Sequence, residues 1–255
     1  MSYIKYIECW KDTKKYCITN EINAPESSKY TYEENELNTS GNIYKTDIII
    51  LNKDTIEVGL DLTSRNLRPL VLNLADNIFP GGLVDMGSGA QEESIFRRTN
   101  YFTTLNHQSG FYPINNTEAI YSPSVTVIKD TNLNNLNGVR LLSFIACPGI
   151  RKPDLVDNKL STMDSEILYK KIELIFQVAF KNGHDSLVLG ALGCGAWNNP
   201  VEQVAEIFQV ITKKWEGVFK EIIFAVLEIN KKDYIVKNDS INRSNYEKFK
   251  DVFNH

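Results

Sequence analysis

Two neighbouring glutamates follow a glycine-rich segment of the chain. Pro80-Gly81-Gly82 is succeeded, after a stretch of small residues, by Gln91-Glu92-Glu93. A pair of carboxyl groups can act as general acid and base when their surroundings push their pKa values apart. Successive residues on a helix lie roughly 100° apart. We therefore expect different roles, with one glutamate acting as an acid and the other holding a sugar hydroxyl.

The start of the predicted helix decides how these carboxyl groups would ionise. Ser88 and Gln91 have the spacing of a capping box, which places Gln91, Glu92 and Glu93 in the first turn. A helix N-terminus favours ionised carboxylates, whereas burial and a nearby like charge favour the protonated form. An acid catalyst at neutral pH requires the second influence to prevail. The alternative is a pair of solvated glutamates at an ordinary helix start.

A second glycine-rich segment has the features of a phosphate-binding loop. Gly193-Cys194-Gly195-Ala196 presents successive backbone N–H groups with small side chains, which suits a diphosphate without any lysine. Trp197 follows and either stacks on a ribose or base or packs in the core. Asn199 and Pro200 predict the N-cap and first position of the next helix. No histidine lies near Cys194 in sequence, so a nucleophilic thiol is not expected.

The elements that must position these loops alternate along the chain. Apolar runs of strand length are separated by helical patterns, as expected for a sheet covered on both faces. The predicted strands are 48–51, 70–74, 141–146, 186–189 and 222–227, and the predicted helices are 6–18, 91–105, 163–182 and 200–214. Gly183 is placed to end the third helix. In open α/β sheets ligands bind beyond the carboxyl ends of strands, where both loops lie.

Length and composition narrow the class of protein. A chain of 255 residues with 42% hydrophobic residues can form one sizeable core. We expect a helical and loop-rich extension over residues 1–42, packed on a domain of residues 43–255. The apolar runs are far shorter than the roughly 20 residues that span a bilayer, and no secretion signal is apparent. A cytoplasmic protein without membrane contact is therefore predicted.

The charged and metal-binding residue types exclude other classes. Four cysteines and three histidines lack the paired spacings of a metal site. The net charge is −4, and no cluster of lysines and arginines predicts direct binding of nucleic acid. A phosphate-bearing ligand would thus be held by backbone N–H groups and helix N-termini.

Several segments occur together in one order along the chain. They are 71–75, Pro80-Gly81-Gly82, Gln91-Glu92-Glu93-Ser94, 121–125, 143–148, 187–197 and 224–228. In this order they closely resemble the microbial-type poly(ADP-ribose) glycohydrolases, a branch of the macrodomain superfamily, over about residues 44 to 253. The resemblance implies a macrodomain-like three-layer α/β/α sandwich with a mixed, mostly parallel central sheet.

The resemblance also implies a role for each candidate residue. Glu93 would protonate the departing ribose oxygen of a ribose–ribose bond and then activate the attacking water, while Glu92 would fix ribose hydroxyls. Gln91 and Asn73 would orient the distal ribose. The other implied substrate-binding residues are Asn77, Gly81, Gly82, Gly193, Cys194, Gly195, Ala196 and Trp197. No metal or organic cofactor is required. The expected partners are ADP-ribose and poly(ADP-ribose) on modified proteins, bound by a monomer.

Two positions depart from the family pattern. Leu83 occupies the place of a third glycine, and Asn198 stands where glycine usually precedes the asparagine. A positive φ at residue 83 would strain a leucine, so Leu83 could bend the loop or narrow the site.

Three functions remain open from the sequence. The favoured one is hydrolysis of poly(ADP-ribose) with release of ADP-ribose, because Gln91-Glu92-Glu93 is intact. A non-catalytic ADP-ribose reader would follow if Leu83 distorts the loop. Hydrolysis of single ADP-ribose units is the third, although macrodomains with that activity generally lack the paired glutamates.

Overall fold

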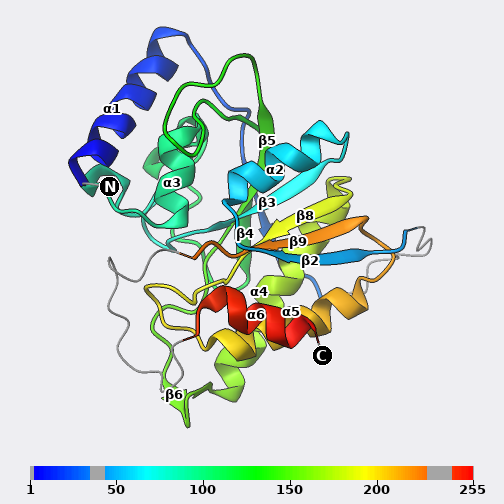
Figure 1. The fold of residues 1–255 in the computed structure, drawn as a ribbon. Coiled ribbons are helices and arrows are strands. Elements are labelled where there is room, and N and C mark those ends of the chain that lie inside the picture. Colours follow the sequence, from blue (N-terminus) through cyan, green and yellow to red (C-terminus); the bar gives the residue numbers. More distant parts are fainter. Residues whose placement is uncertain (1–2, 35–43, 229–242, 255) are drawn as a thin grey trace.

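The central sheet has seven strands in the order β1-β4-β5-β3-β8-β9-β2 (Figure 1). The computed structural model describes residues 3–34, 44–228 and 243–254. The strands are β1 (Ser28–Thr31), β2 (Asp47–Leu51), β3 (Pro69–Leu74), β4 (Glu118–Thr126), β5 (Leu141–Cys147), β8 (Ser186–Leu189) and β9 (Glu221–Ala225). β4 pairs antiparallel with β1 and with β5, whereas the pairs from β5 to β2 are parallel. The predicted mixed, mostly parallel sheet is confirmed.

Helices cover both faces of this sheet. They are α1 (Tyr3–Thr19), α2 (Thr55–Ser64), α3 (Gln91–Arg98), α4 (Thr162–Lys181), α5 (Val201–Lys214) and α6 (Asn245–Phe253). Three short 3-10 helices, η1 (Val84–Met86), η2 (Tyr101–Thr103) and η3 (His107–Ser109), and a small hairpin of β6 (Leu155–Val156) and β7 (Lys159–Leu160) complete the described elements.

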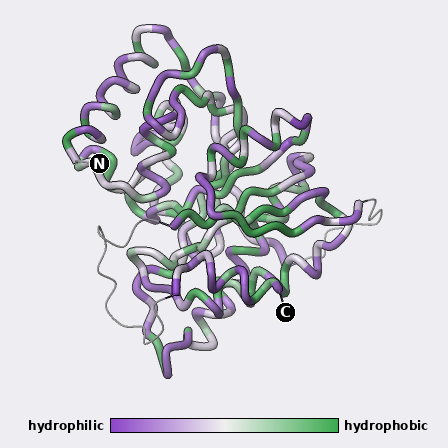
Figure 2. The backbone as a smooth tube through the Cα atoms, in the orientation of Figure 1, coloured by the Kyte–Doolittle hydropathy of each residue, from purple (hydrophilic) through white to green (hydrophobic). Residues whose placement is uncertain are grey.

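Alternate residues of each strand enter different cores. Leu70 and Leu72 pack with α4, α5 and α6, while Val71 between them packs with α1, α2 and α3. This alternation follows from the period of two along a strand. The strands are accordingly the most hydrophobic part of the chain, and the outer sides of the helices are largely hydrophilic (Figure 2). The arrangement is the expected three-layer α/β/α sandwich.

Helix ends show where local patterns hold and where they fail. α4 begins after Ser161, whose side chain accepts from Asp164 N–H, and ends before Gly183 at φ +69°, as predicted. The helix predicted over 91–105 is too long, because α3 stops at Arg98. Thr99 there is extended and forms a bridge with Val127 of the neighbouring chain segment.

The N-terminal segment joins the domain in two ways. α1 lies against α3 and η1, and β1 adds an edge strand to the sheet. The predicted boundary between residues 42 and 43 lies outside the described residues. No helix of the described ranges is long and apolar enough to cross a bilayer.

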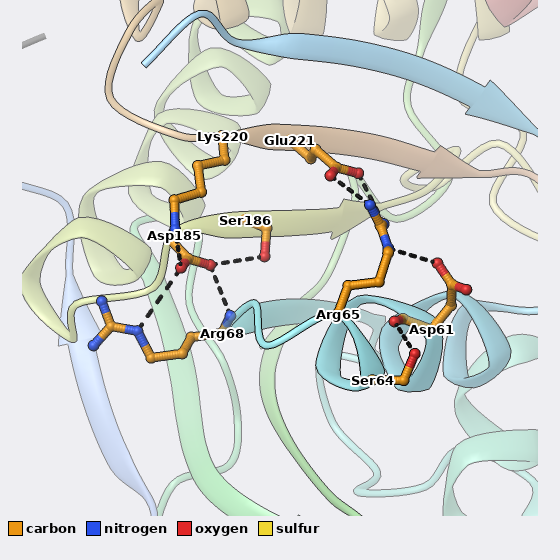
Figure 3. A network of polar contacts seen from close by, with 8 residues as sticks. All are labelled: Asp61, Ser64, Arg65, Arg68, Asp185, Ser186, Lys220 and Glu221. Carbon is orange, nitrogen blue, oxygen red and sulfur yellow. Dashed lines mark hydrogen bonds and ion pairs between the residues drawn. The ribbon is translucent and has the colours of Figure 1, made fainter. Parts of the chain in front are cut away.

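A polar network ties the amino ends of β3, β8 and β9 together, at the opposite edge from the glycine-rich loops (Figure 3). Asp185 accepts hydrogen bonds from Arg68 N–H at 2.7 Å and from Lys220 Nζ at 3.2 Å. Arg65 forms a two-pronged ion pair with Glu221, at 2.6 and 2.9 Å. Burial alone would raise the pKa of Asp185, but the donors from Arg68 and Lys220 lower it overall. The network stabilises the edge that carries no candidate site residue.

Replacing Asp185 by asparagine should destabilise the fold by roughly 1–3 kcal/mol at neutral pH, because Arg68 N–H and the Lys220 ammonium lose a buried, charged acceptor. Since folding lowers the pKa of Asp185 below its ordinary value of 3.8, its contribution exists above that value and is lost as the pH falls through the folded pKa. Urea unfolding at several pH values measures this. Asp61→Asn, at an exposed position, should change the unfolding free energy by less than about 0.5 kcal/mol. Equal stability of Asp185→Asn and the parent at pH 7 would contradict the assignment.

Candidate active site

Three neighbouring parallel strands bring their carboxyl ends to one edge of the sheet. β3 leads into residues 75–90, which we call the glycine loop, and β8 leads into residues 190–200, the Gly-Cys-Gly loop. β5, on the other side of β3, leads into Gly149. A Cβ atom on Gly149 would lie only 2.6 Å from Gly193 Cα, so this turn and the Gly-Cys-Gly loop are in direct contact. The two predicted site loops thus follow neighbouring strands at the same edge of the sheet, as the switch-point rule requires.

Glu92 and Glu93 are both buried, at 3% and 6% exposure. Glu92 Oε1 accepts hydrogen bonds from Asn73 Nδ2 and Gly81 N–H, each at 3.2 Å, and its Oε2 accepts from Asp76 N–H at 2.7 Å. Glu93 Oε1 accepts from Leu83 N–H at 3.1 Å. Its Oε2 accepts no hydrogen bond from the described residues. The alternative of two solvated glutamates is wrong.

The two carboxyl groups converge on Gly82. A Cβ atom there would lie 2.8 Å from Glu93 Oε1 and 3.4 Å from Glu92 Oε2, and Gly82 has φ +56°. Gly81, at φ +79°, rests on the ring of Phe96, 2.6 Å from where its Cβ would be. Both positions thus require glycine for space and for backbone conformation.

Burial governs the ionisation of Glu92. Burial above all, and the charge of Glu93 to a smaller extent, raise the pKa of Glu92 to about 8 against the opposing N–H donors of Asp76, Asn73 and Gly81. Glu92 is therefore mostly neutral at pH 7. At Glu92, burial and the neighbouring charge therefore outweigh the effect of the helix N-terminus, and the carboxyl group keeps its proton.

Gln91 fixes the first turn of α3 on the end of β3. Its Oε1 accepts from Leu74 N–H at 2.8 Å, and its Nε2 donates to the Leu72 carbonyl at 2.7 Å. The predicted capping box of Ser88 is wrong, because the N-cap is Ala90 and makes no side-chain bond. The amide of Gln91 takes over the anchoring of the helix start.

Leu83 does not strain the loop. Its φ is −101°, outside the left-handed region, and its side chain is 55% exposed. The expected conflict between leucine and a positive φ is therefore wrong. The contribution of this residue to the site is its backbone N–H on Glu93.

Asp76 shapes the glycine loop and was not among the predicted site residues. Its Oδ1 accepts from the N–H groups of Ile78 and Phe79, at 2.7 and 2.9 Å, and its own N–H reaches Glu92. The signal in the sequence was an aspartate at the start of a turn, where it can bind the backbone two residues on. Asn77, which was predicted, accepts from Arg151 Nη1 at 3.4 Å through its side chain.

The Gly-Cys-Gly loop leaves several backbone donors available. The N–H groups of Gly193, Gly195, Ala196 and Trp197 find no acceptor among the described residues, whereas Cys194 N–H donates to the Ala191 carbonyl. Gly195 and Ala196 are exposed. Burial raises the pKa of the Cys194 thiol, which opposes a nucleophilic role. The loop can hold an anion through amides without a lysine.

Asn199 holds this loop to the turn after β5. Its side-chain amide donates to the Ile150 carbonyl at 2.7 Å and accepts from Ile150 N–H at 3.1 Å. The predicted N-cap role of Asn199 is wrong, since α5 starts at Val201 with Pro200 as N-cap. Asn198 has φ +56°, a conformation that asparagine tolerates better than most residues. This departure from glycine is therefore accommodated.

The predicted site residues thus fall into two groups at one edge of the sheet. Asn73, Asn77, Gly81, Gly82, Gln91, Glu92 and Glu93 lie at the end of β3, in the glycine loop and at the start of α3, and Gly193 to Trp197 lie in the Gly-Cys-Gly loop. Within the described residues, no group of three or more histidine, cysteine, aspartate or glutamate side chains is arranged to hold a metal ion.

The layered sheet and the two loops at its edge define an α/β protein of macrodomain-like architecture. Within that class, the model of the microbial-type PARG catalytic domain, PARG being poly(ADP-ribose) glycohydrolase, matches residues 2–130, about half of the chain. The chain belongs to this family and is a poly(ADP-ribose) glycohydrolase. No curated protein matches the sequence.

Solved structures share the fold over nearly the whole chain. Poly(ADP-ribose) glycohydrolase from Thermomonospora curvata, bound to the inhibitor ADP-HPD, has a TM-score of 0.79 and 22% identity, covering 97% of this chain and 99% of its own. The Deinococcus radiodurans enzyme in complex with ADP-ribose has a TM-score of 0.73 and 22% identity, covering 89% and 94%. At these identities the likeness establishes the fold.

The raised pKa of Glu92 should make stability depend on pH. Because folding raises this pKa from its ordinary 4.5 to about 8, the contribution is fully present below pH 4.5 and is lost as the pH rises through 8. The unfolding free energy of the parent should therefore fall relative to Glu92→Gln over this range, measured by urea unfolding. Glu206→Gln, on the exposed side of α5, serves as control and should track the parent. Parallel pH curves for the parent and Glu92→Gln would contradict a buried neutral Glu92.

Proposed function

We propose that the two loops hold the terminal ADP-ribose unit of a poly(ADP-ribose) chain and that Glu93 cleaves the ribose–ribose bond beside it. The observation that carries this proposal is the unequal bonding of the two carboxyl groups around Gly82. Both oxygens of Glu92 are occupied by N–H donors, whereas Glu93 uses one oxygen for Leu83 and keeps the other available. An acid needs a free oxygen from which to deliver its proton.

In the proposed reaction, Glu93 first protonates the ribose oxygen that leaves. The glycosidic bond breaks toward an oxocarbenium-like centre, and the Glu93 carboxylate then takes a proton from the water that attacks it. The products are a shorter polymer and ADP-ribose. Because Glu92 is mostly neutral at pH 7, the Glu93 carboxylate that is left after proton transfer meets no second negative charge, and Glu92 can hold a ribose hydroxyl.

The neighbours of Glu92 give the distal ribose its proposed surroundings. Asn73 donates to Glu92, while its Oδ1 is buried without a partner among the described residues and could accept from a hydroxyl group. Gln91 binds β3 through both ends of its amide, so we propose that it positions Glu92 instead of contacting the sugar. Asn77, whose side chain accepts from Arg151 Nη1, is proposed to contact the ligand from the glycine loop.

The Gly-Cys-Gly loop supplies the proposed diphosphate site. Its open N–H groups, at Gly193 and from Gly195 to Trp197, match an anion that must be bound without lysine. Cys194 would contribute through its backbone, and Trp197 would pack over the distal ribose. ADP-ribose bound to the Deinococcus radiodurans enzyme is the ligand that supports this assignment.

The conformation of Leu83 weighs against a non-catalytic reader. That alternative depended on a distorted glycine loop, and φ at Leu83 is −101°. We further propose a monomer that acts in the cytoplasm, without membrane or direct nucleic-acid contact. The four free thiols, two of them buried, support a reducing compartment.

Glu93→Gln should abolish most polymer hydrolysis. Losing a general acid–base group costs about 100- to 10,000-fold in rate, whereas the Kd for ADP-ribose should stay within about threefold, which is under 1 kcal/mol. Product release from labelled polymer and calorimetry with ADP-ribose measure the two quantities. Glu26→Gln, at an exposed position, is the control. Polymer cleavage at the parent rate by Glu93→Gln would show that the assignment is wrong.

The same assay should distinguish hydrolysis of the polymer from hydrolysis of single ADP-ribose units. Polymer and mono-ADP-ribosylated protein are offered side by side to the purified parent, and polymer should be the better substrate. Faster release from mono-modified protein would favour hydrolysis of single units.

A further inference from the structure

Arg97, in the last turn of α3, is a buried cation with no ion pair among the described residues. Its side chain is only 1% exposed, and no carboxylate of the described residues lies within ion-pair distance. The next residue, Arg98, is buried as well but binds both oxygens of Asp54 at 2.9 Å. An unpaired buried guanidinium is costly, and burial accordingly lowers the pKa of Arg97. Contacts other than an ion pair must therefore stabilise the buried charge of Arg97.

Arg97 connects the end of the glycine loop to α1. Its Nη1 donates to the Ser88 carbonyl at 2.5 Å, and its guanidinium lies over the ring of Tyr6, 4.2 Å from the ring centre. The carbonyl of Arg97 accepts from Thr13 Oγ1 at 2.5 Å. The aromatic face replaces a carboxylate as the partner of the charge.

Glu93 lies four residues before Arg97 on the same helix, hence on the same face. Its charge favours the protonated form of Arg97. Glu93 also receives Leu83 N–H from the glycine loop. Besides the bonds of Glu92 to Asp76 and Gly81, the loop is thus fixed to α3 by Glu93 near its middle and by Arg97 near its end.

α1 braces the same loop at further positions. Trp10 Nε1 donates to Asp85 Oδ1 at 2.7 Å, and Lys14 Nζ reaches the same oxygen at 3.2 Å. Gly87, at φ +75°, lies so close to the Tyr3 carbonyl that a Cβ would stand 2.5 Å from it. The helix therefore backs the loop on the side away from the sheet (Figure 1).

We propose that Arg97 is a positioning residue for polymer hydrolysis, which sets the place of the glycine loop relative to Glu93 and is itself held by Tyr6 of α1. This inference rests on the proposed function of Glu93. Under this proposal, α1 affects the rate of the reaction through Arg97, although α1 itself does not contact the ligand. A displacement of about 1 Å in such a site can cost about 100-fold in rate.

The test compares Arg97→Met with Arg97→Lys. Arg97→Met removes the charge and the Ser88 bond while filling the space, and kcat on polymer should fall about 10- to 100-fold. KM and the Kd for ADP-ribose should stay within about threefold, a change of under 1 kcal/mol. Arg97→Lys should recover part of kcat, because one donor suffices for the Ser88 carbonyl and an ammonium can also lie on Tyr6. Thermal unfolding of each variant is recorded alongside.

A second arm tests α1 itself. Tyr6→Leu should lower kcat with little change in ADP-ribose binding, whereas Tyr16→Leu should leave kcat unchanged. Tyr16 lies on the same helix and is 38% exposed. The pair separates loss of the Arg97 contact from general weakening of α1.

Each outcome decides between the inference and the proposed function. A loss in Glu93→Gln with none in Arg97→Met overturns the inference and keeps the proposed function. Full activity in both variants overturns the proposed function and the inference with it. A fall in kcat, ADP-ribose affinity and melting temperature together in Arg97→Met, without recovery in Arg97→Lys, shows a merely structural residue and also overturns the inference.

Discussion

The attachment of the first turn of α3 to the end of β3 is the interaction on which the site depends. Gln91 holds the backbone on either side of Asn73, and Glu92 gathers N–H groups from Asn73, Asp76 and Gly81. These bonds fix the helix start, the strand end and the glycine loop in one arrangement. Glu93 then has only one place to lie, against Gly82 and Leu83 N–H. The sheet and its helix layers keep β3 rigid enough for this arrangement to persist.

This arrangement buries several ionisable groups, and burying a charge costs free energy. Each group offsets that free energy in a different way. Glu92 remains mostly neutral at pH 7 because burial outweighs its N–H donors. Arg98 keeps its charge beside Asp54, and Arg97 lies on the ring of Tyr6. Placing these groups within two turns of one helix concentrates electrostatic strain at α3. A helix with several buried ionisable groups needs partners on α1, α2 and β3. This requirement explains why both ends of α3 are bound to other elements.

The sequence predicted the parallel strands of the sheet well and the N-caps of the helices poorly, and both outcomes have physical reasons. Apolar runs such as 70–74 and 186–189 are readable because both of their faces are buried. α2 was missed, since Gly59 packs against Leu142 and Val71 and interrupts the apolar pattern. The predicted caps at Ser88 and Asn199 failed because α3 begins after Ala90 and α5 after Pro200, while tertiary contacts hold Ser88 and Asn199. Arg97 takes the Ser88 carbonyl, and Ile150 takes the Asn199 amide. No local pattern can reveal such partners.

Leu83 shows what kind of information the family pattern lacks. A leucine in place of glycine suggests damage to the site if the side chain or a positive φ matters there. In the folded chain, φ is −101° and the side chain faces solvent, while the N–H group reaches Glu93. Gly81 and Gly82 differ, because each has positive φ and a neighbour where a Cβ would stand. The loop acts through backbone donors, so glycine is required where the backbone presses on Phe96, on the carboxyl pair and, at Gly87, on the Tyr3 carbonyl.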